Sequence, residues 1–345
     1  MPDTALALAA PRRRAALSSR ALWLTGSLAA LILLAAVSLR LGLRPVSWAE
    51  VWQAMSAYDP ASAEQIVIRQ MRLPRLLGAG LTGAALGISG TLIQGLTRNP
   101  LADPGLLGIN GGAALAVTGC ILLLGITDPA GFVWAALGGA LAAALLVAVL
   151  SGGSLASPLR LLLAGAAISS LFLALTRALL LASQQALDVY RFWVLGGFDG
   201  IQLETIAALA PFFVLGALAA LAAASGLDAL LLGEDSARSL GVRTGAARLL
   251  AGTAIVLLSG SAVALAGPIA FAGLIVPHLA RWAAGPGLRW SLALSAPFGA
   301  ILLLGADLAG RLPLFGGSLQ AGVMTALLGG PALIWMVRRN GARSL

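Results

Sequence analysis

The chain has 345 residues, of which 59% are hydrophobic and only 10% are charged, and its mean hydropathy is +0.95. This composition excludes an ordinary soluble domain and indicates a protein that crosses a membrane several times. All 22 basic residues are arginine. Because a Walker-A phosphate loop requires a lysine, the chain cannot by itself be a P-loop ATPase. The net charge of +9 does not indicate nucleic-acid binding, since the arginines flank apolar segments and form no continuous basic face.

The N-terminal part of the chain predicts a polar tail, one membrane span and a loop. Residues 1–20 are polar and rich in arginine, and the stretch Ala21–Leu39 is almost wholly apolar. This stretch is longer than a signal-peptide core and no small-residue cleavage site follows it cleanly, so we expect an uncleaved first span. The more polar stretch Arg40–Arg75 then predicts an external loop, with Trp48 and Trp52 at the membrane interface.

Further apolar segments follow, and most are long enough to cross about 30 Å of hydrocarbon. They are Leu76–Leu96, Gly105–Ile126, Gly131–Leu150, Leu159–Ala182, Thr205–Ala224, Ala246–Ala266, the shorter Ile269–Ala284, Ser291–Ala309 and Leu319–Val337. The predicted fold class is therefore an all-α polytopic membrane protein with about ten transmembrane helices over residues 21–337. Arginines are about twice as frequent in the segments that this topology places inside. We therefore expect residues 1–20 and the C-terminal tail, residues 338–345, to be cytoplasmic.

Glycine is unusually frequent, with 43 residues, and many of them lie within the apolar segments. The segment Leu76–Leu96 contains Gly78, Gly80, Gly83, Gly87 and Gly90. Small residues let helix backbones approach closely in lipid. We therefore interpret these glycines as a packing surface and not as a ligand site.

Charged residues gather in one short segment, Ser225–Arg248, between two apolar segments. We expect two short helices here, in about residues 226–243. Asp228 would cap the first helix, and Gly233 would end it in a left-handed turn. With apolar spans on both sides, this segment would form a compact polar knob on the cytoplasmic membrane surface.

The second helix of this knob is predicted from its charges. Glu234 and Asp235 would begin it, where the positive end of a helix favours acidic residues, and Gly241 would end it. Arg238 lies within pairing distance of both acidic residues. Composition leaves two interpretations open, an ordinary solvated loop and a docking element for a cytoplasmic partner.

Few titratable residues lie where they could serve chemistry at membrane depth. Arg177 falls within a predicted span, and Asp307 and Arg311 are four residues apart and would pair near a helix end. The only histidine, His278, is expected to bond to the backbone rather than to bind a metal. No arrangement indicates catalysis or a metal site, and the single Cys120 excludes an internal disulfide. Transport through this protein would therefore be powered from outside the chain.

Several sequence motifs together resemble the FecCD family, the permeases of ABC importers for ferric siderophores, haem and cobalamin. The motifs run through most of the chain and comprise Arg72-Leu-Pro-Arg75, Gly90-Thr-Leu-Ile-Gln94, Asn99-Pro-Leu-Ala-Asp-Pro104, Gly105-Leu-Leu-Gly108, Gly233–Gly241, Gly267–His278 and Ala306–Arg311. This sequence departs from the family pattern at Ser318–Gly322, where the family usually carries Glu-Leu-Pro before its last span. This departure puts the transfer of substrate preference in doubt more than that of the transport class.

The resemblance implies a ten-helix permease in the bacterial cytoplasmic membrane. It would act as a homodimer with two cytoplasmic ATPases and one periplasmic or lipid-anchored binding protein. ATP and magnesium would bind in the ATPase, and this chain would need no cofactor and would not be an enzyme. The implied ATPase-coupling residues are Gly233, Glu234, Asp235, Ala237, Arg238 and Gly241. The implied binding-protein docking residues are Arg72, Arg75 and Arg311.

The alternatives at this point concern both the arginines and the cargo. The three arginines could instead be interfacial residues that only anchor helix ends. A ferric siderophore is the expected cargo, with haem and cobalamin as alternatives within the family. A secondary transporter that works without an ATPase is the alternative outside it.

Overall fold

The chain folds into a bundle of helices, in a computed structural model that describes residues 3–42, 46–153, 158–285, 287–312 and 319–340. These ranges contain helices and connecting loops and no strand, which confirms the all-α class. The helices are α1 (Asp3–Arg40), α2 (Trp48–Ser56), α3 (Ala63–Ile66), a π-helical turn η1 (Val67–Arg72), α4 (Leu73–Thr97), a 3-10 turn η2 (Pro104–Leu107), α5 (Ile109–Leu124), α6 (Pro129–Ser151), α7 (Pro158–Leu181), α8 (Gln184–Trp193), α9 (Leu203–Leu231), α10 (Glu234–Ser239), α11 (Thr244–Ala266), α12 (Ala272–Ala284), α13 (Leu288–Gly310) and α14 (Ala321–Asn340).

Within the described residues, seven helices are long and apolar enough to cross a membrane. The predicted number of about ten is not reached by this criterion. The helix α5 and the apolar part of α14, Ala321–Trp335, are shorter, and α12 has 13 residues. The chain is thus a multi-pass membrane protein with at least these seven apolar helices.

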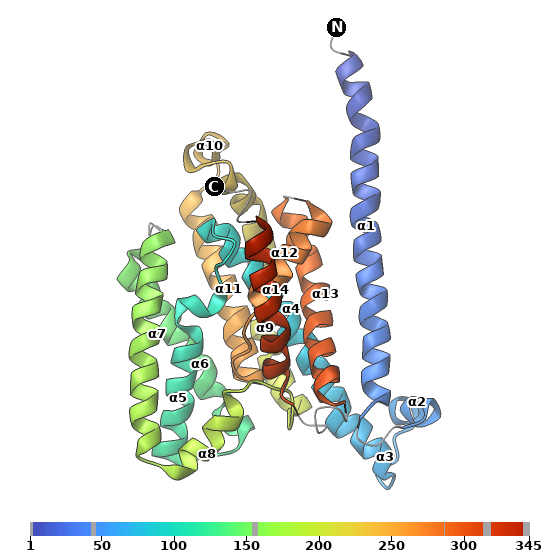
Figure 1. The fold of residues 1–345 in the computed structure, drawn as a ribbon, viewed down its shortest axis with the longest axis vertical. Coiled ribbons are helices and arrows are strands. Elements are labelled where there is room, and N and C mark those ends of the chain that lie inside the picture. Colours follow the sequence, from blue (N-terminus) through green and yellow to red (C-terminus); the bar gives the residue numbers. More distant parts are fainter. Residues whose placement is uncertain (1–2, 43–45, 154–157, 286, 313–318, 341–345) are drawn as a thin grey trace.

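The helix α4 lies at the centre of the bundle, where it packs against α13, α11, α12 and α9 (Figure 1). Of its most apolar stretch 67% is buried within the protein, whereas only 11% of that of α1 is buried. The helix α1 stands at one side and packs mainly on α13. Figure 1 shows α10 at the same end as the start of α1, and α2, α3 and α8 at the opposite end. We call these the α10 end and the α2 end.

Glycine pairs bring the central helices into backbone contact, as the sequence predicted. A Cβ atom placed on Gly83 of α4 would collide with the backbone of Gly299 in α13, and one placed on Gly90 would collide with the backbone of Gly273 in α12. Further along the contact between α4 and α13, the buried hydroxyls of Thr91 and Ser295 hydrogen-bond at 2.6 Å. These contacts fix the positions of α12 and α13 on α4.

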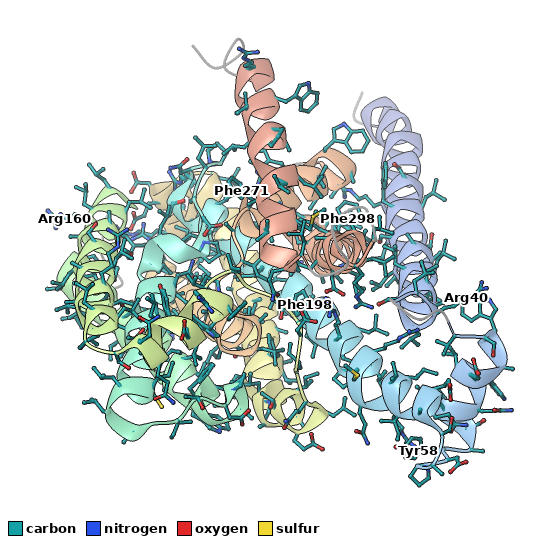
Figure 2. The ribbon with its side chains drawn as sticks, turned by 60° about the horizontal axis from the view of Figure 1, so that its bottom comes forward. Arg40, Tyr58, Arg160, Phe198, Phe271 and Phe298 are labelled. Carbon is teal, nitrogen blue, oxygen red and sulfur yellow. The ribbon has the colours of Figure 1, made fainter. Side chains whose placement is uncertain are left out.

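A short non-helical segment, Gly267–Phe271, separates α12 from α11. Gly267 ends α11 with a φ of 74°, and Phe271 before α12 has a left-handed φ of 67°, which is uncommon for a residue other than glycine. Its side chain lies directly against Gly329 of α14, where a Cβ would collide with it. Figure 2 shows Phe271 and Phe298 among the helices, and Tyr58 and Arg160 at the edges of the molecule.

The predicted external loop Arg40–Arg75 is largely helical in its described part. Ser47 and Glu50 form a reciprocal capping box at the start of α2, with hydrogen bonds of 2.6 and 3.2 Å. The backbone N–H of Ser47, followed by its hydroxyl, lowers the pKa of the Glu50 carboxyl. The Ser-x-x-Glu signal was present in the sequence. Trp52 is 74% exposed, as expected for an interfacial aromatic residue.

The glycine crossings lead to a testable prediction about stability. Substitution Gly83→Ala should lower the thermal midpoint of the detergent-solubilised protein, because the added methyl group forces α4 away from α13. Gly80→Ala is the matched control in the same helix, since nothing lies within 4 Å of a Cβ at Gly80. Equal midpoints for the two variants would contradict the role of the crossing.

Candidate functional sites at the two ends of the bundle

A network of two arginines and two aspartates occupies the α2 end. Arg75, in the first turn of α4, bonds to Asp307 near the end of α13 at 2.7 Å and also pairs with Asp199 in the loop between α8 and α9. Asp307 pairs through its second oxygen with Arg311. The predicted pairing of Asp307 with Arg311 is confirmed. The partnership with Arg75 and the participation of Asp199 could not be predicted, because they join residues far apart in the sequence.

The four side chains differ in exposure. The Asp307 side chain is 0% exposed and that of Arg311 is 10% exposed, whereas Arg75 is 18% and Asp199 is 52% exposed. Asp307 is thus an internal anchor that holds two guanidinium groups. Asp199 forms the outward-facing part of the network.

Arg72 lies beside this network and holds the end of α1. Its guanidinium donates hydrogen bonds of 2.7 Å to the carbonyl oxygens of Leu39 and Arg40, and the residue is 6% exposed. Arg311 also donates to the carbonyl oxygen of Ser38, at 3.3 Å. Both arginines therefore tie α1 to the central helices.

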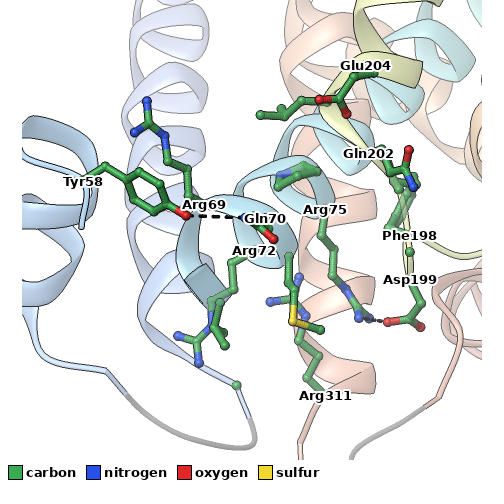
Figure 3. A pocket seen from close by; sticks show the side chains of 17 residues that line it. Tyr58, Arg69, Gln70, Arg72, Arg75, Phe198, Asp199, Gln202, Glu204 and Arg311 are labelled. Carbon is green, nitrogen blue, oxygen red and sulfur yellow. Dashed lines mark hydrogen bonds and ion pairs between the residues drawn. The ribbon is translucent and has the colours of Figure 1, made fainter. Parts of the chain in front are cut away.

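These residues line a cavity of about 1090 Å³ at the α2 end (Figure 3). Its polar lining includes Tyr58, Arg69, Asp199, Gln202 and Glu204, besides all three arginines of the predicted docking set, Arg72, Arg75 and Arg311. Figure 3 shows Tyr58 and Arg69 on one side and Asp199 and Glu204 on the other. The sequence motif placed the three arginines without revealing this cavity, which depends on the loop between α8 and α9.

The knob at the α10 end differs in part from the prediction. No separate helix begins at Asp228, because α9 continues without a break to Leu231 through the alanine-rich stretch that precedes the knob. The Asp228 carboxylate instead accepts a hydrogen bond of 2.8 Å from the backbone N–H of Leu288, at the start of α13. The predicted helix cap is therefore wrong, and Asp228 joins two membrane helices.

The second helix of the knob is confirmed as α10. Gly233 precedes it with a φ of 114°, and Gly241 follows it with a φ of 77°, so both turns need a positive φ, which glycine adopts without strain. Ala237 is fully buried against the bundle, with its N–H bonded to the carbonyl oxygen of Gly233 at 3.0 Å. The short helix is thus fixed by its glycines and by one buried alanine.

The carboxylate of Glu234 organises the charges of α10. It accepts bonds from Arg238 at 2.9 Å and from Arg248, in α11, at 3.0 Å. The bond to Arg238 was predicted from the spacing, and Arg248 was missed because it belongs to the next helix. Asp235 forms no ion pair with a described residue. Arg238 keeps 61% of its side chain exposed and so stands on the outer surface of the knob.

Polar contacts near the α10 end join α4 and the loop after it to α9 and α12. The side chain of Gln94 accepts a bond of 2.7 Å from Arg281 in α12, and Arg98 donates to the carbonyl oxygen of Leu230 at the end of α9. The loop after α4 places Asp103 against Gly273, and burial raises the pKa of its carboxyl although the Gly105 N–H donates to it at 2.8 Å. These contacts join the loop to α9 and α12.

The remaining candidate residues do not form a chemical site. His278 bonds through Nδ1 to the carbonyl oxygen of Leu274 at 2.8 Å, as predicted. Arg177 lies exposed on α7. The described residues contain no cluster of three or more histidine, cysteine or acidic side chains that could hold a metal ion. Ser318 of the departing motif lies outside the described residues.

The internal anchor leads to a second prediction. Asp307→Asn should lower the free energy of unfolding by about 3 kcal/mol, because Arg75 and Arg311 both lose a buried ionic partner. Thermal unfolding in detergent measures this. The control is Asp188→Asn, whose pair with Arg191 is 3.3 Å long and exposed, and it should change stability by less than about 1 kcal/mol. A midpoint for Asp307→Asn no lower than that of the control would contradict the anchoring role.

The chain is similar to known transport proteins over most of its length. The ferric enterobactin transport system permease protein FepD of Escherichia coli is 41% identical, with 93% of this chain and 96% of FepD covered. The vitamin B12 import system permease protein BtuC of Vibrio cholerae is 39% identical, with 84% and 88% covered. A solved metal-chelate type ABC transporter in an inward-facing conformation is 31% identical, with a TM-score of 0.81 and with 92% of this chain and 98% of that chain covered.

The family assignment follows from the whole length of the match. Residues 30–339 match the model of the FecCD transport family, a range that includes both the arginine network and α10. Seven apolar helices and an all-helical bundle agree with a permease. This chain belongs to the FecCD transport family.

Proposed function

We propose that this chain is the membrane-spanning permease of a binding-protein-dependent ABC importer for ferric siderophores. The observation that carries the proposal is the match to the FecCD transport family over residues 30–339, together with 41% identity to a ferric enterobactin permease. A separate ATPase subunit would supply the energy, and this chain would not be an enzyme. Import of cobalamin is the second candidate, because the vitamin B12 permease BtuC is 39% identical.

The proposed topology has about ten spans, in which α5, α12 and α14 join the seven longer helices. The short helices would cross among longer neighbours, and the packing of the 13-residue α12 against α4 and α13 supports this arrangement. The α10 end would face the cytoplasm together with both chain ends, and the α2 end would face the periplasm or the cell exterior. The membrane would be the bacterial cytoplasmic membrane.

The knob at the α10 end is the proposed contact with the ATPase. Gly233 and Gly241 fix its turns, Ala237 fastens it to the bundle, and Glu234 and Asp235 begin it. Arg238 is the exposed cation on its surface. Because Glu234 also holds Arg248 of α11, a force on α10 would be transmitted to a membrane helix through a charged contact at 3.0 Å. A dimer of ATPase subunits and a second copy of this permease would complete the transporter.

The cavity at the α2 end is the proposed contact with the substrate-binding protein. Arg72, Arg75 and Arg311 line it together. Arg75 would meet acidic side chains of the binding protein, while Arg72 and Arg311 would also hold α1 in place through its last carbonyl oxygens. Charge pairs at a protein surface add little affinity each, but they orient the partner and speed its approach.

Uptake in cells tests the proposed cargo. Cells with and without this chain are given iron-labelled enterobactin, an iron-labelled hydroxamate and labelled cobalamin. Loss of uptake of an iron complex alone is expected. Loss of cobalamin uptake alone would replace the siderophore proposal with the second candidate, and unchanged uptake of all three would contradict both.

A charge reversal tests the proposed coupling role of α10. Arg238→Glu should abolish transport in vesicles that contain the permease and its ATPase, while the protein still inserts and ATP is still hydrolysed. The substitution places a second acidic residue four positions from Glu234 and reverses the charge of the exposed surface. Arg289→Glu is the matched control, an exposed arginine at the start of α13 outside the knob. Wild-type transport by Arg238→Glu would refute the docking role.

A further inference from the structure

The loop between α8 and α9 presents Asp199 to Arg75 in a fixed position. Asp199 follows Phe198, which is 1% exposed, and precedes Gly200, whose φ is 74°. The backbone before Phe198 is held on two sides. The N–H of Gly197 donates to the carbonyl oxygen of Ala266 at 2.8 Å, and the carbonyl oxygen of Gly196 accepts from Gly322 at 2.9 Å. Asp199 is therefore carried by an anchored loop, and its side chain is about half exposed.

Asp199 and Asp307 contact different nitrogens of Arg75 and differ in burial. Asp307 is buried and already neutralises the inner side of Arg75, through bonds from Nε at 2.8 Å and Nη2 at 2.7 Å. The remaining nitrogen, Nη1, points to Asp199, which is 52% exposed at the cavity. The dashed line from Arg75 to Asp199 in Figure 3 marks this outer pair. Asp199 thus occupies the cavity side of Arg75, the side from which an external carboxylate would also approach it.

We propose that Asp199 is an internal substitute for the binding protein's carboxylate, and that it must turn away from Arg75 before the binding protein can dock there. This inference rests on the proposed docking role of Arg75 and adds an affinity-determining residue to it. Asp307 is the positioning residue, which keeps the guanidinium aimed at the cavity while Asp199 leaves.

The charge balance of the network supports an exchange of partners. Arg75 and Arg311 carry two positive charges, and Asp199 and Asp307 carry two negative charges. When an external carboxylate replaces Asp199 at Arg75, the number of ion pairs stays the same. Docking through an exchange therefore gains little free energy from the pair itself. A partner without an acidic side chain at this point would leave Asp199 in place.

The first test needs no partner and uses phenylglyoxal, which modifies accessible arginine side chains. The purified permease is labelled, and mass spectrometry follows the rate at Arg75. In Asp199→Asn this rate should rise about two- to fivefold, the range expected for loss of one partly exposed ion pair. An unchanged rate would overturn the proposal. Asp199→Glu retains the charge and should keep the rate near that of the wild type.

Glu204→Gln is the matched control, because Glu204 lines the same cavity, is exposed and forms no ion pair with a described residue. It removes the same charge from the cavity and should leave labelling of Arg75 unchanged. Equal acceleration by both substitutions would show a general charge effect and would overturn the specific role of Asp199. Because Arg72 is buried, faster labelling of Arg72 would show that a variant is misfolded. If this happens in Asp199→Asn, the test is repeated with Asp199→Ser.

The second test measures association of the permease, in lipid nanodiscs at low salt, with the substrate-binding protein of the same import system. Asp199→Asn should lower Kd about two- to fivefold, and Glu204→Gln should change it less. Arg75→Glu tests the proposed docking role separately. If Arg75→Glu weakens binding and Asp199→Asn leaves Kd unchanged, docking stands and the exchange is refuted. If Arg75→Glu binds as the wild type does, the docking role itself fails.

Discussion

The close crossing of α4 with α13 is the contact on which the rest of this structure depends. Lipid gives helices no hydrophobic reason to associate, so small residues that allow backbone contact must hold them together. Gly83 and Gly299 meet at this crossing, and Gly90 brings α12 to the same helix. The crossing also fixes the geometry of the arginine network at the α2 end. It places Arg75, in the first turn of α4, beside Asp307, in the last turns of α13. A backbone contact inside the membrane thus positions an ion pair at its surface.

Much of the fold was predictable from sequence because each span is a local property. The apolar segments gave most of the helices to within a few residues, and the glycines of α4 gave its packing role. The number of spans was not confirmed, since length and composition do not decide whether helices such as α12 cross the membrane. The helical content of Arg40–Arg75 was missed although Ser47 and Glu50 signalled a capped helix.

The candidate sites were predictable only where their contacts are local. The pairs of Glu234 with Arg238 and of Asp307 with Arg311 are four residues apart on one helix turn, and both formed. Asp199 and Arg248 were missed because their partners come from other helices, so only the tertiary arrangement brings them together. The cap at Asp228 was wrong for a related reason. Asp228 has the residue type of a helix cap, but α9 continues past it to Leu231. Its carboxylate accepts a hydrogen bond from the backbone N–H of Leu288, which is distant in the sequence.

The same helix connects the two ends of the molecule. With 25 residues, α4 is about 37 Å long, and it carries Arg75 in its first turn and Gln94 in its last. Gln94 is bonded to Arg281 of α12, and Arg98, the residue that ends α4, is bonded to the last turn of α9 beneath α10. Because glycine crossings at Gly83 and Gly90 hold the middle of α4 against α13 and α12, we expect a displacement at one end to move the helix as a body. Rigid motion of α4 with its neighbours is therefore the simplest physical link between the cavity at the α2 end and the knob at the α10 end.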